Sequence, residues 1–131
     1  MKTYIKLLFW MLVIITALKT LNANNNPNSE CNILHKGVFK YGEYNNEVTV
    51  IIKRKKHIEY HNGGKYIIKS KIVWVNDCEY NMTMTKTTVP NFPYGKGDVM
   101  NVKINKVDGR DIYYTSTVEE NSWEGKLTKV K

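Results

Sequence analysis

The fold is decided by residues 66–84, YIIKSKIVWVNDCEYNMTM. On both sides of Asn76-Asp77, apolar side chains alternate with lysine, asparagine or threonine. A period of two residues gives a β-strand one buried face and one solvated face. The stretch therefore predicts two antiparallel strands joined by a tight turn. The apolar positions are Tyr66, Ile68, Ile72 and Trp74 before the turn, and Tyr80, Met82 and Met84 after it.

The same alternation recurs along most of the chain. Residues that favour turns separate the segments, and beyond the first 23 residues no window of a dozen residues has a helical period. Short strands that pair with their neighbours in sequence tend to close into a barrel, which hides the sheet edges. We predict an all-β, single small antiparallel up-and-down barrel of seven or eight strands, with a two-layer sandwich as the alternative. The predicted strands cover residues 37–41, 47–54, 57–61, 65–74, 78–86, 98–106, 110–118 and 123–130.

Loop lengths follow from which side chains must share a face. Placing Ile58 and Tyr60 opposite Ile68 and Tyr66 requires the three-residue loop Asn62-Gly63-Gly64. Placing Trp74 on the face of Tyr80 requires the loop Val75-Asn76-Asp77. The turn at Asp108-Gly109 leaves two alternatives open, with Ile104 opposite either Tyr113 or Ile112.

The N-terminus is typical of a secretory signal peptide over residues 1–23. Lys2 and Lys6 precede the apolar residues 7–18, and Ala23 provides a small residue at the predicted cleavage site. An uncleaved anchor is the alternative, but twelve helical residues extend only about 18 Å, against about 30 Å for a bilayer core. We expect a disordered leader over residues 24–30, a barrel domain over 31–131, and a protein exported to the periplasm or beyond.

The only two cysteines are Cys31 and Cys78. An exported chain meets oxidising conditions, which favours a disulfide between them. A metal site would need further ligands at short spacing, and a nucleophilic cysteine would need a free thiol beside a histidine. The sequence shows neither pattern, so we predict a disulfide.

The chain is basic, with 20 Lys and Arg against 12 Asp and Glu, a net charge of +8. Without residues 1–23 the balance is 17 against 12, or +5. The densest run, Lys53, Arg54, Lys55 and Lys56, predicts an anion-binding surface, with a solvated turn as the alternative. Lysine dominates over arginine, the residue that recognises phosphate and guanine by paired hydrogen bonds, so we expect no specific nucleic-acid partner.

One long connection, residues 90–97, carries two aromatic residues, Phe92 and Tyr94. Aromatic residues in a long loop favour either a lid at the barrel mouth or a plug that fills the end of the barrel. We predict that Phe92, Tyr94 and Trp74 contact a small ligand.

Residues suited to metal binding or catalysis are scattered. His57 and His61 are too far apart on a strand to share an ion, and Met82 and Met84 suit a core better than a soft metal. We expect Glu59 to pair with Arg54 or a lysine, as a structural contact. The sequence predicts no cofactor and no enzyme, with a hydrolase of cell-envelope substrates as a distant alternative.

The stretch Cys31-(x5)-Gly37-x-Phe39-x-Tyr41, together with Trp74-Val75-Asn76-Asp77-Cys78-Glu79-Tyr80, Arg54 and Ile58-Glu59, resembles a family of small exported bacterial proteins of unknown function. The resemblance covers nearly all of residues 31–130. Gly37-Val38-Phe39 is also similar to the start of lipocalin-like barrels, which have a glycine and an aromatic residue at the closed end. The resemblance implies a fold and an exported location, and it implies no activity.

Two functions follow as expectations. In the first, a monomeric, secreted, non-catalytic protein holds a small apolar or amphipathic ligand at the barrel mouth. In the second, the protein docks on an envelope protein or an anionic surface through its lysine-rich strands.

Overall fold

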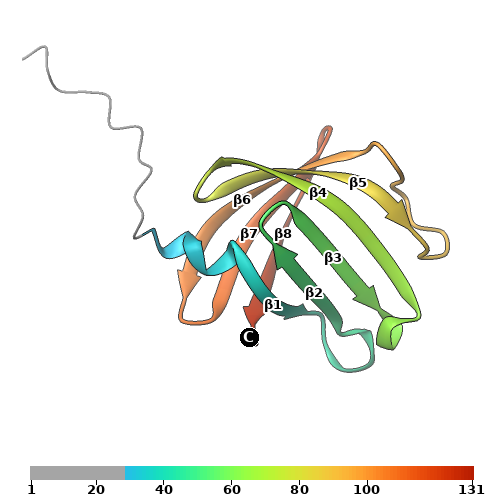
Figure 1. Cartoon of the computed structure of the whole chain (residues 1–131), viewed down its shortest axis with the longest axis horizontal. Coiled ribbons are helices and arrows are strands. Elements are labelled where there is room, and N and C mark those ends of the chain that lie inside the picture. Colours follow the sequence, from blue (N-terminus) through green and yellow to red (C-terminus); the bar gives the residue numbers. More distant parts are fainter. Residues whose placement is uncertain (1–28) are drawn as a thin grey trace, which may run out of the picture.

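The alternating segments form eight antiparallel strands in the computed structural model, which describes residues 29–131 (Figure 1). The predicted signal peptide and residues 24–28 of the predicted leader lie outside the described residues. Ser29 caps the first short helix and Glu30 lies in it, ahead of the predicted domain start at Cys31. The elements are η1 (Glu30–Leu34), β1 (Lys36–Tyr41), η2 (Tyr44–Asn46), β2 (Val48–Lys53), β3 (Lys56–His61), η3 (Asn62–Gly64), β4 (Tyr66–Asn76), β5 (Glu79–Thr87), β6 (Val99–Asp108), β7 (Asp111–Val118) and β8 (Asn121–Lys129).

Each strand pairs with its neighbours in sequence, and β1 pairs with β8 to close the barrel. This closure confirms the predicted up-and-down barrel and excludes the sandwich. The seam between β1 and β8 is short, with register pairs at Phe39–Lys129 and Lys40–Thr128. Hydrogen bonds between Val38 and Lys131 extend the seam past the end of β8. Within residues 29–131, no helix has the length and apolarity needed to cross a membrane.

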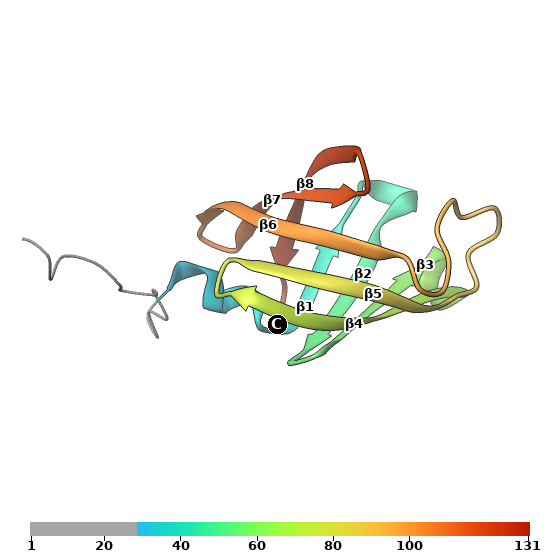
Figure 2. The same ribbon diagram turned by 90° about the horizontal axis from the view of Figure 1, so that it is seen from above.

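The barrel has two different ends (Figure 2). We call the end with η1 and the turns at 54–55, 77–78 and 109–110 the closed end. The opposite end carries the connections 42–47, 62–65, 88–98 and 119–120, and we call it the mouth. The long β5–β6 connection extends from the mouth, on the opposite side of the barrel from η1.

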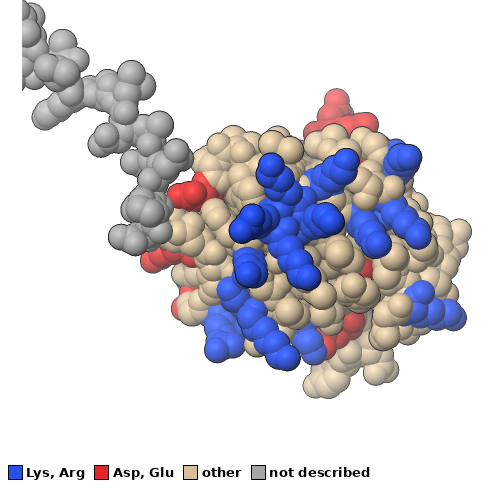
Figure 3. Space-filling model, viewed as in Figure 1, with Lys and Arg blue, Asp and Glu red and all other residues tan. Residues whose placement is uncertain are grey.

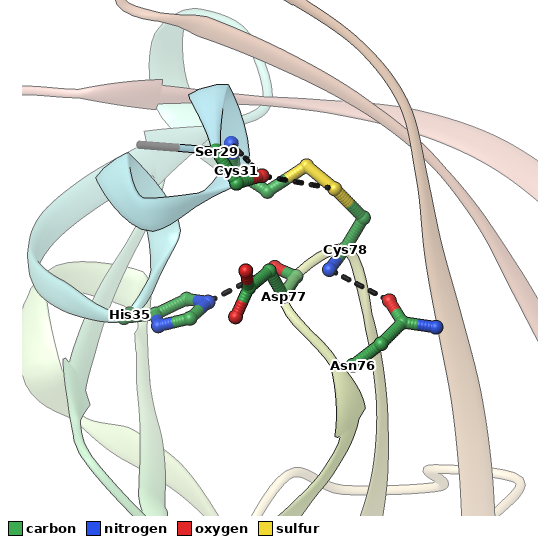
Figure 4. The surroundings of a disulfide bond; sticks show 6 residues. All are labelled: Ser29, Cys31, His35, Asn76, Asp77 and Cys78. Carbon is green, nitrogen blue, oxygen red and sulfur yellow. Dashed lines mark hydrogen bonds between the residues drawn. A yellow bond between two sulfur atoms is a disulfide. The ribbon is translucent and has the colours of Figure 1, made fainter. Parts of the chain in front are cut away.

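A disulfide between Cys31 and Cys78 fastens η1 to the β4–β5 turn, as predicted (Figure 4). The Cα atoms of the two cysteines are 5.2 Å apart. Nearby, Nε2 of His35 donates to the carbonyl oxygen of Asp77 at 2.9 Å, and the Cys78 amide donates to Oδ1 of Asn76 at 2.8 Å. The disulfide and the His35 hydrogen bond hold η1 against the barrel, while the Cys78 hydrogen bond shapes the turn itself.

The closed half of the barrel is filled by large apolar side chains. Leu34 of η1 is fully buried against residues from several strands, so η1 contributes to the core as well as covering it. Burial of a side chain of this size stabilises a fold by about 1.5–3 kcal/mol. The other fully or almost fully buried residues here are Phe39, Ile52, Ile72 and Ile112.

The predicted pairing of β3 with β4 is wrong by one residue. The connection has four residues, because the Lys65 amide donates to the carbonyl oxygen of Asn62 at 3.2 Å and extends the turn. Tyr66 consequently pairs with His61, and Ile68 pairs with Glu59. The shift reverses the two faces of β3, so that His57, Glu59 and His61 point inward while Ile58 and Tyr60 face outward.

The β4–β5 and β6–β7 turns show why loop length alone does not determine the register of two strands. Trp74 pairs with Tyr80, which confirms the predicted common face, but the turn is Asp77-Cys78 and the register shift lies between Trp74 and Asn76. Between β6 and β7, a bulge after Ile104 places this residue opposite Tyr114. Neither predicted alternative for Ile104 occurs, because a β-bulge changes register without changing the turn.

The disulfide closes a loop of 47 residues and should be a major source of stability. Replacing Cys31 and Cys78 together with serine is expected to lower the free energy of unfolding by about 4 kcal/mol, since the unfolded chain regains its freedom. Urea unfolding followed by tryptophan fluorescence measures this change. As a control, a reductant should lower the stability of the wild type and leave the variant unchanged. Equal unfolding midpoints for the oxidised wild type and the variant would contradict the expectation.

Candidate functional site

A cavity of about 250 Å³ lies inside the barrel, on the mouth side of the filled core. Most of its wall is apolar, and the polar groups that reach it come mainly from β1, β3, β4 and β7. A volume of this size is just below the range of about 300–1,000 Å³ that is usual for small-molecule sites. Its apolar wall includes Val50, Ile68, Met82, Met84, Met100, Val102 and Leu127, and its polar groups include Tyr41, His57, Glu59, Ser70, Tyr114 and Ser116.

Glu59 is the centre of a hydrogen-bonded cluster on the cavity wall. Its Oε1 accepts from Nε2 of His57 at 2.9 Å, and its Oε2 accepts from Nε2 of His61 at 2.8 Å. The Tyr41 hydroxyl also donates to Oε2, at 2.8 Å. Side chains two residues apart on a strand share a face, so β3 supplies both histidines and the carboxylate, while β1 supplies the tyrosine.

The geometry fixes which nitrogen of His57 donates to Glu59. A carboxylate only accepts, so Nε2 of His57 carries the proton that the hydrogen bond needs. Nδ1 of the same ring is enclosed and has no hydrogen-bond partner among the described residues. Within residues 29–131 it is the only buried side-chain nitrogen or oxygen without a partner, and an unpaired buried polar atom is costly.

The cluster keeps the Glu59 carboxyl ionised. Burial on its own would raise its pKa. The hydrogen bonds that it accepts from His57, His61 and Tyr41, together with the electrostatic effect of His57, outweigh burial and hold the pKa well below its usual range. The cavity therefore has a fixed negative group in its wall at neutral pH.

Three tyrosines around the cavity remain protonated. Burial, with the charge of Glu59, raises the pKa of Tyr114 to about 12. Burial also raises the pKa of Tyr41, and the charge of Glu59 raises it further. The pKa of Tyr80 is raised mainly by burial, with smaller contributions from Tyr114 and Glu59. Their hydroxyl groups are therefore present as donors over the whole physiological range.

Aromatic rings cover the mouth side of the cavity. Phe92 and Tyr94 both line it, with ring centroids 5.9 Å apart. Tyr94 stacks on Trp123 of β8, with centroids 6.3 Å apart and planes 13° from parallel. The structure thus places two of the three predicted ligand contacts, Phe92 and Tyr94, at the same site, as part of a ring cluster.

Trp74, the third predicted contact, lies elsewhere. It belongs to the closed end, where its ring is 4.0 Å from that of His35 and 4.8 Å from that of Tyr80. Its Nε1 donates to the carbonyl oxygen of Arg54 at 3.0 Å. Trp74 shares a face with the cavity residue Tyr80 but stands at the opposite end of the barrel from Phe92 and Tyr94, so it does not line the cavity.

The four residues predicted to bind anions surround the β2–β3 turn at the closed end. Lys53 and Lys56 are register partners, and Arg54 and Lys55 form the turn between them. All four are exposed. They lie among further lysines from neighbouring strands, which gather on one face of the molecule (Figure 3).

Sequence reasoning missed several site residues. Trp123 and Tyr114 had no special pattern, and the Glu59 cluster was hidden by the misplaced register of β3. The predicted ion pair of Glu59 with Arg54 or a lysine is wrong, because the carboxylate is held by two histidines and a tyrosine. The alternation His57-x-Glu59-x-His61 could have revealed the cluster, since it puts three polar groups on one strand face.

Fold and site together define a small, closed β-barrel with a partly polar internal cavity. Comparisons with protein-family models, curated proteins and solved structures gave no match. Over residues 29–131, no group of three or more His, Cys, Asp or Glu side chains could hold a metal ion.

Replacing Glu59 with glutamine should destabilise the protein in a pH-dependent way. The amide NH₂ would face groups that donate, so we expect a loss of about 3 kcal/mol at pH 7. Because the pKa of Glu59 is lower in the folded state, its contribution is complete above the ordinary carboxyl pKa of about 4.3 and declines as the pH falls below it. The difference between wild type and Glu59→Gln in urea unfolding should therefore shrink between pH 7 and pH 3.

Glu79 provides the control for this experiment. Its carboxylate accepts from Nδ2 of Asn101 at 2.9 Å. A glutamine retains an acceptor for that bond, so Glu79→Gln should cost less than about 1 kcal/mol at either pH. A loss at Glu59 that is the same at pH 3 and pH 7 would show that its charge plays no part.

Proposed function

We propose that this protein is an exported, non-catalytic binding protein that holds one small amphipathic molecule inside the barrel. The observation that carries the proposal is the cavity, which combines an apolar wall with a single polar cluster at Glu59. An apolar enclosure with a few converging polar groups is typical of small-molecule sites. In this arrangement the ligand body contacts the methionines and aliphatic residues, and its polar end lies beside Glu59.

The β5–β6 connection provides the entrance. Two backbone hydrogen bonds attach the end of this connection to Met84 of β5. The Met84 amide donates to the carbonyl oxygen of Asp98 at 2.9 Å, and the Met84 carbonyl oxygen accepts from the Gly97 amide at 2.8 Å. Beyond this base, Phe92 and Tyr94 contact each other through their rings. We propose that this aromatic tip moves aside to admit the ligand and then covers it, together with Trp123.

Binding without catalysis is the better proposal because of the state of Glu59. A carboxylate whose pKa is far below neutrality is a weak general base. The disulfide is compatible with export, and the export itself rests on the N-terminal sequence. The resemblance to small exported bacterial proteins and the monomeric state likewise stay predictions.

Native mass spectrometry of the protein purified from its own host should show one retained small molecule per chain. Filling the cavity should remove it: Ser116 is buried and lines the cavity, so Ser116→Leu is expected to abolish retention. Tyr113→Leu, on the exposed face of the same strand, is the control and should keep the ligand. A wild-type protein that carries nothing and binds no small amphipathic compound would refute the proposal.

A specific observation favours a second function, binding to an anionic lipid surface. Lys36, Lys53, Lys56 and Lys71 are consecutive register partners across β1–β4, and we call them the lysine row. All are exposed, and none makes a salt bridge with a described residue. Like charges directly opposite each other on neighbouring strands are destabilising, so the row reduces the stability of the barrel. Such a row suits a flat anionic partner (Figure 3).

Lys56 has a lysine partner on both sides, so Lys56→Glu should raise stability and weaken lipid binding together. We expect a gain of about 1 kcal/mol in the free energy of unfolding, as two repulsive pairs become attractive. Sedimentation with phosphatidylglycerol vesicles at low salt should show reduced binding. Lys126→Glu, outside the lysine row on β8, is the matched control. Equal vesicle binding by both variants, or none by the wild type, would exclude this second function.

A further inference from the structure

We infer that the molecule held in the barrel is a small organic cation, an amine with an apolar body whose ammonium group lies beside Glu59. This inference rests on the proposed function and specifies its ligand. It is carried by three features of the described residues: the charged groups of the cavity wall, the free acceptor capacity of Glu59, and the charge of the mouth.

The cavity wall contains carboxylates and no lysine or arginine. Of its twenty lining residues, Glu59 and Asp98 are acidic, and His57 is the only basic type. The enclosed Nδ1 of His57 has no partner among the described residues, so this ring reaches the rest of the cluster only through the bond from its Nε2 to Glu59. An anionic ligand would meet a like charge in a low dielectric, which is strongly unfavourable.

Glu59 retains room for one more donor. A carboxylate has about four lone-pair positions, and His57, His61 and Tyr41 occupy three of them. The remaining position is on Oε1, which accepts only from His57. An ammonium group is a compact donor that fits such a single position.

Aromatic rings supply the other interaction that cations prefer. Six of the twenty lining residues are Phe, Tyr or Trp. The negative face of an aromatic ring attracts an ammonium group, especially away from water. The six rings belong to Tyr41, Tyr80, Phe92, Tyr94, Tyr114 and Trp123.

The mouth is acidic although the protein as a whole is basic. Its four connections carry five carboxylates and two lysines, and Glu47 is paired with Lys40 of β1 at 2.7 Å, so four carboxylates make no salt bridge with a described residue. The lysine row, in contrast, begins beside the closed end. Charge of one sign around an opening raises the local concentration of the opposite ion and its rate of entry. The carboxylates are Glu43, Glu47, Asp98, Glu119 and Glu120, and the lysines are Lys65 and Lys96.

Three probes with the same apolar body test the inference directly. The purified protein, freed of retained molecules, is titrated at pH 7.5 with 2-phenylethylamine, 2-phenylethanol and 3-phenylpropanoate, using isothermal titration calorimetry. A hydrogen bond to a charged partner corresponds to an affinity gain on the order of tenfold or more, so the amine should bind at least tenfold tighter than the alcohol. The acid should bind most weakly.

The outcomes separate this inference from the proposed function. If the alcohol binds as tightly as the amine, or the acid binds best, the cation is excluded while small-molecule binding stands. If none of the three probes binds and the protein from its host carries no molecule, the proposed function fails and the inference fails with it.

Three variants assign the effect to charge. Asp98→Asn keeps an acceptor for the Gly95 amide, which donates to Oδ2 at 2.8 Å, so the fold should persist. It should weaken amine binding about two- to fivefold, while Asp108→Asn at the closed end should not. In Glu59→Gln the ratio of amine to alcohol affinity should fall towards one. Since a ratio is insensitive to the fraction of folded protein, this result stays valid if the variant is less stable. An unchanged ratio would overturn the assignment to Glu59.

Discussion

An ionised carboxylate can be enclosed in a barrel only if donors surround it, and the arrangement of this molecule on its mouth side follows from that constraint. Glu59 obtains two donors from its own strand, because His57 and His61 are two residues away on either side. Tyr41 completes the set across the barrel. On the closed side the strands present aliphatic and aromatic residues that fill the barrel, whereas on the mouth side they present these polar groups and the cavity lies beside them. The closed half is therefore filled and the mouth half hollow because the strands bury different kinds of residue in the two halves.

The charges are distributed so that the surface and the interior differ in sign. Lysines occupy the outer positions of β1–β4, including direct cross-strand neighbours, and the charged groups that reach the otherwise mostly apolar cavity wall are carboxylates. Because successive residues of a strand alternate between the two sides of the barrel, a single segment such as β3 can serve both purposes. Lys56 lies on its outside and Glu59 on its inside. The outer and inner surfaces can thus contribute to separate functions.

The sequence was sufficient to predict the strands and the crosslink but only part of the site. Alternation at Ile72, Trp74, Tyr80 and Met82 predicts the correct common face but not the pairing, because the predicted three-residue loop places Trp74 opposite Cys78 and the structure pairs it with Tyr80. On β3 both faces have mixed character, with Ile58 and Tyr60 on one and His57, Glu59 and His61 on the other. The apolar residues Ile58 and Tyr60 predicted the wrong inward face for β3. The connection has four residues and ends at Lys65, and the extra residue exchanges the inward and outward faces of the strand. The separation of Trp74 from Phe92 and Tyr94 follows from the predicted topology, because the turn after Trp74 and the connection that carries the other two lie at opposite ends of β5.

The seam between β1 and β8 makes the barrel mechanically uneven. Every other pair of adjacent strands has a longer register than Phe39–Lys129 and Lys40–Thr128. The disulfide spans β1–β4 and ties that half together. In contrast, β8 is held to β1 by this short ladder, by its extension from Val38 to Lys131, and by Lys129, whose Nζ donates to the carbonyl oxygens of Ile33 and Lys36. If the barrel widens to bind a larger ligand, separation of β1 from β8 breaks the shortest of the strand pairings. The covalent half would then remain as a rigid wall, and the C-terminal strand would act as the movable one.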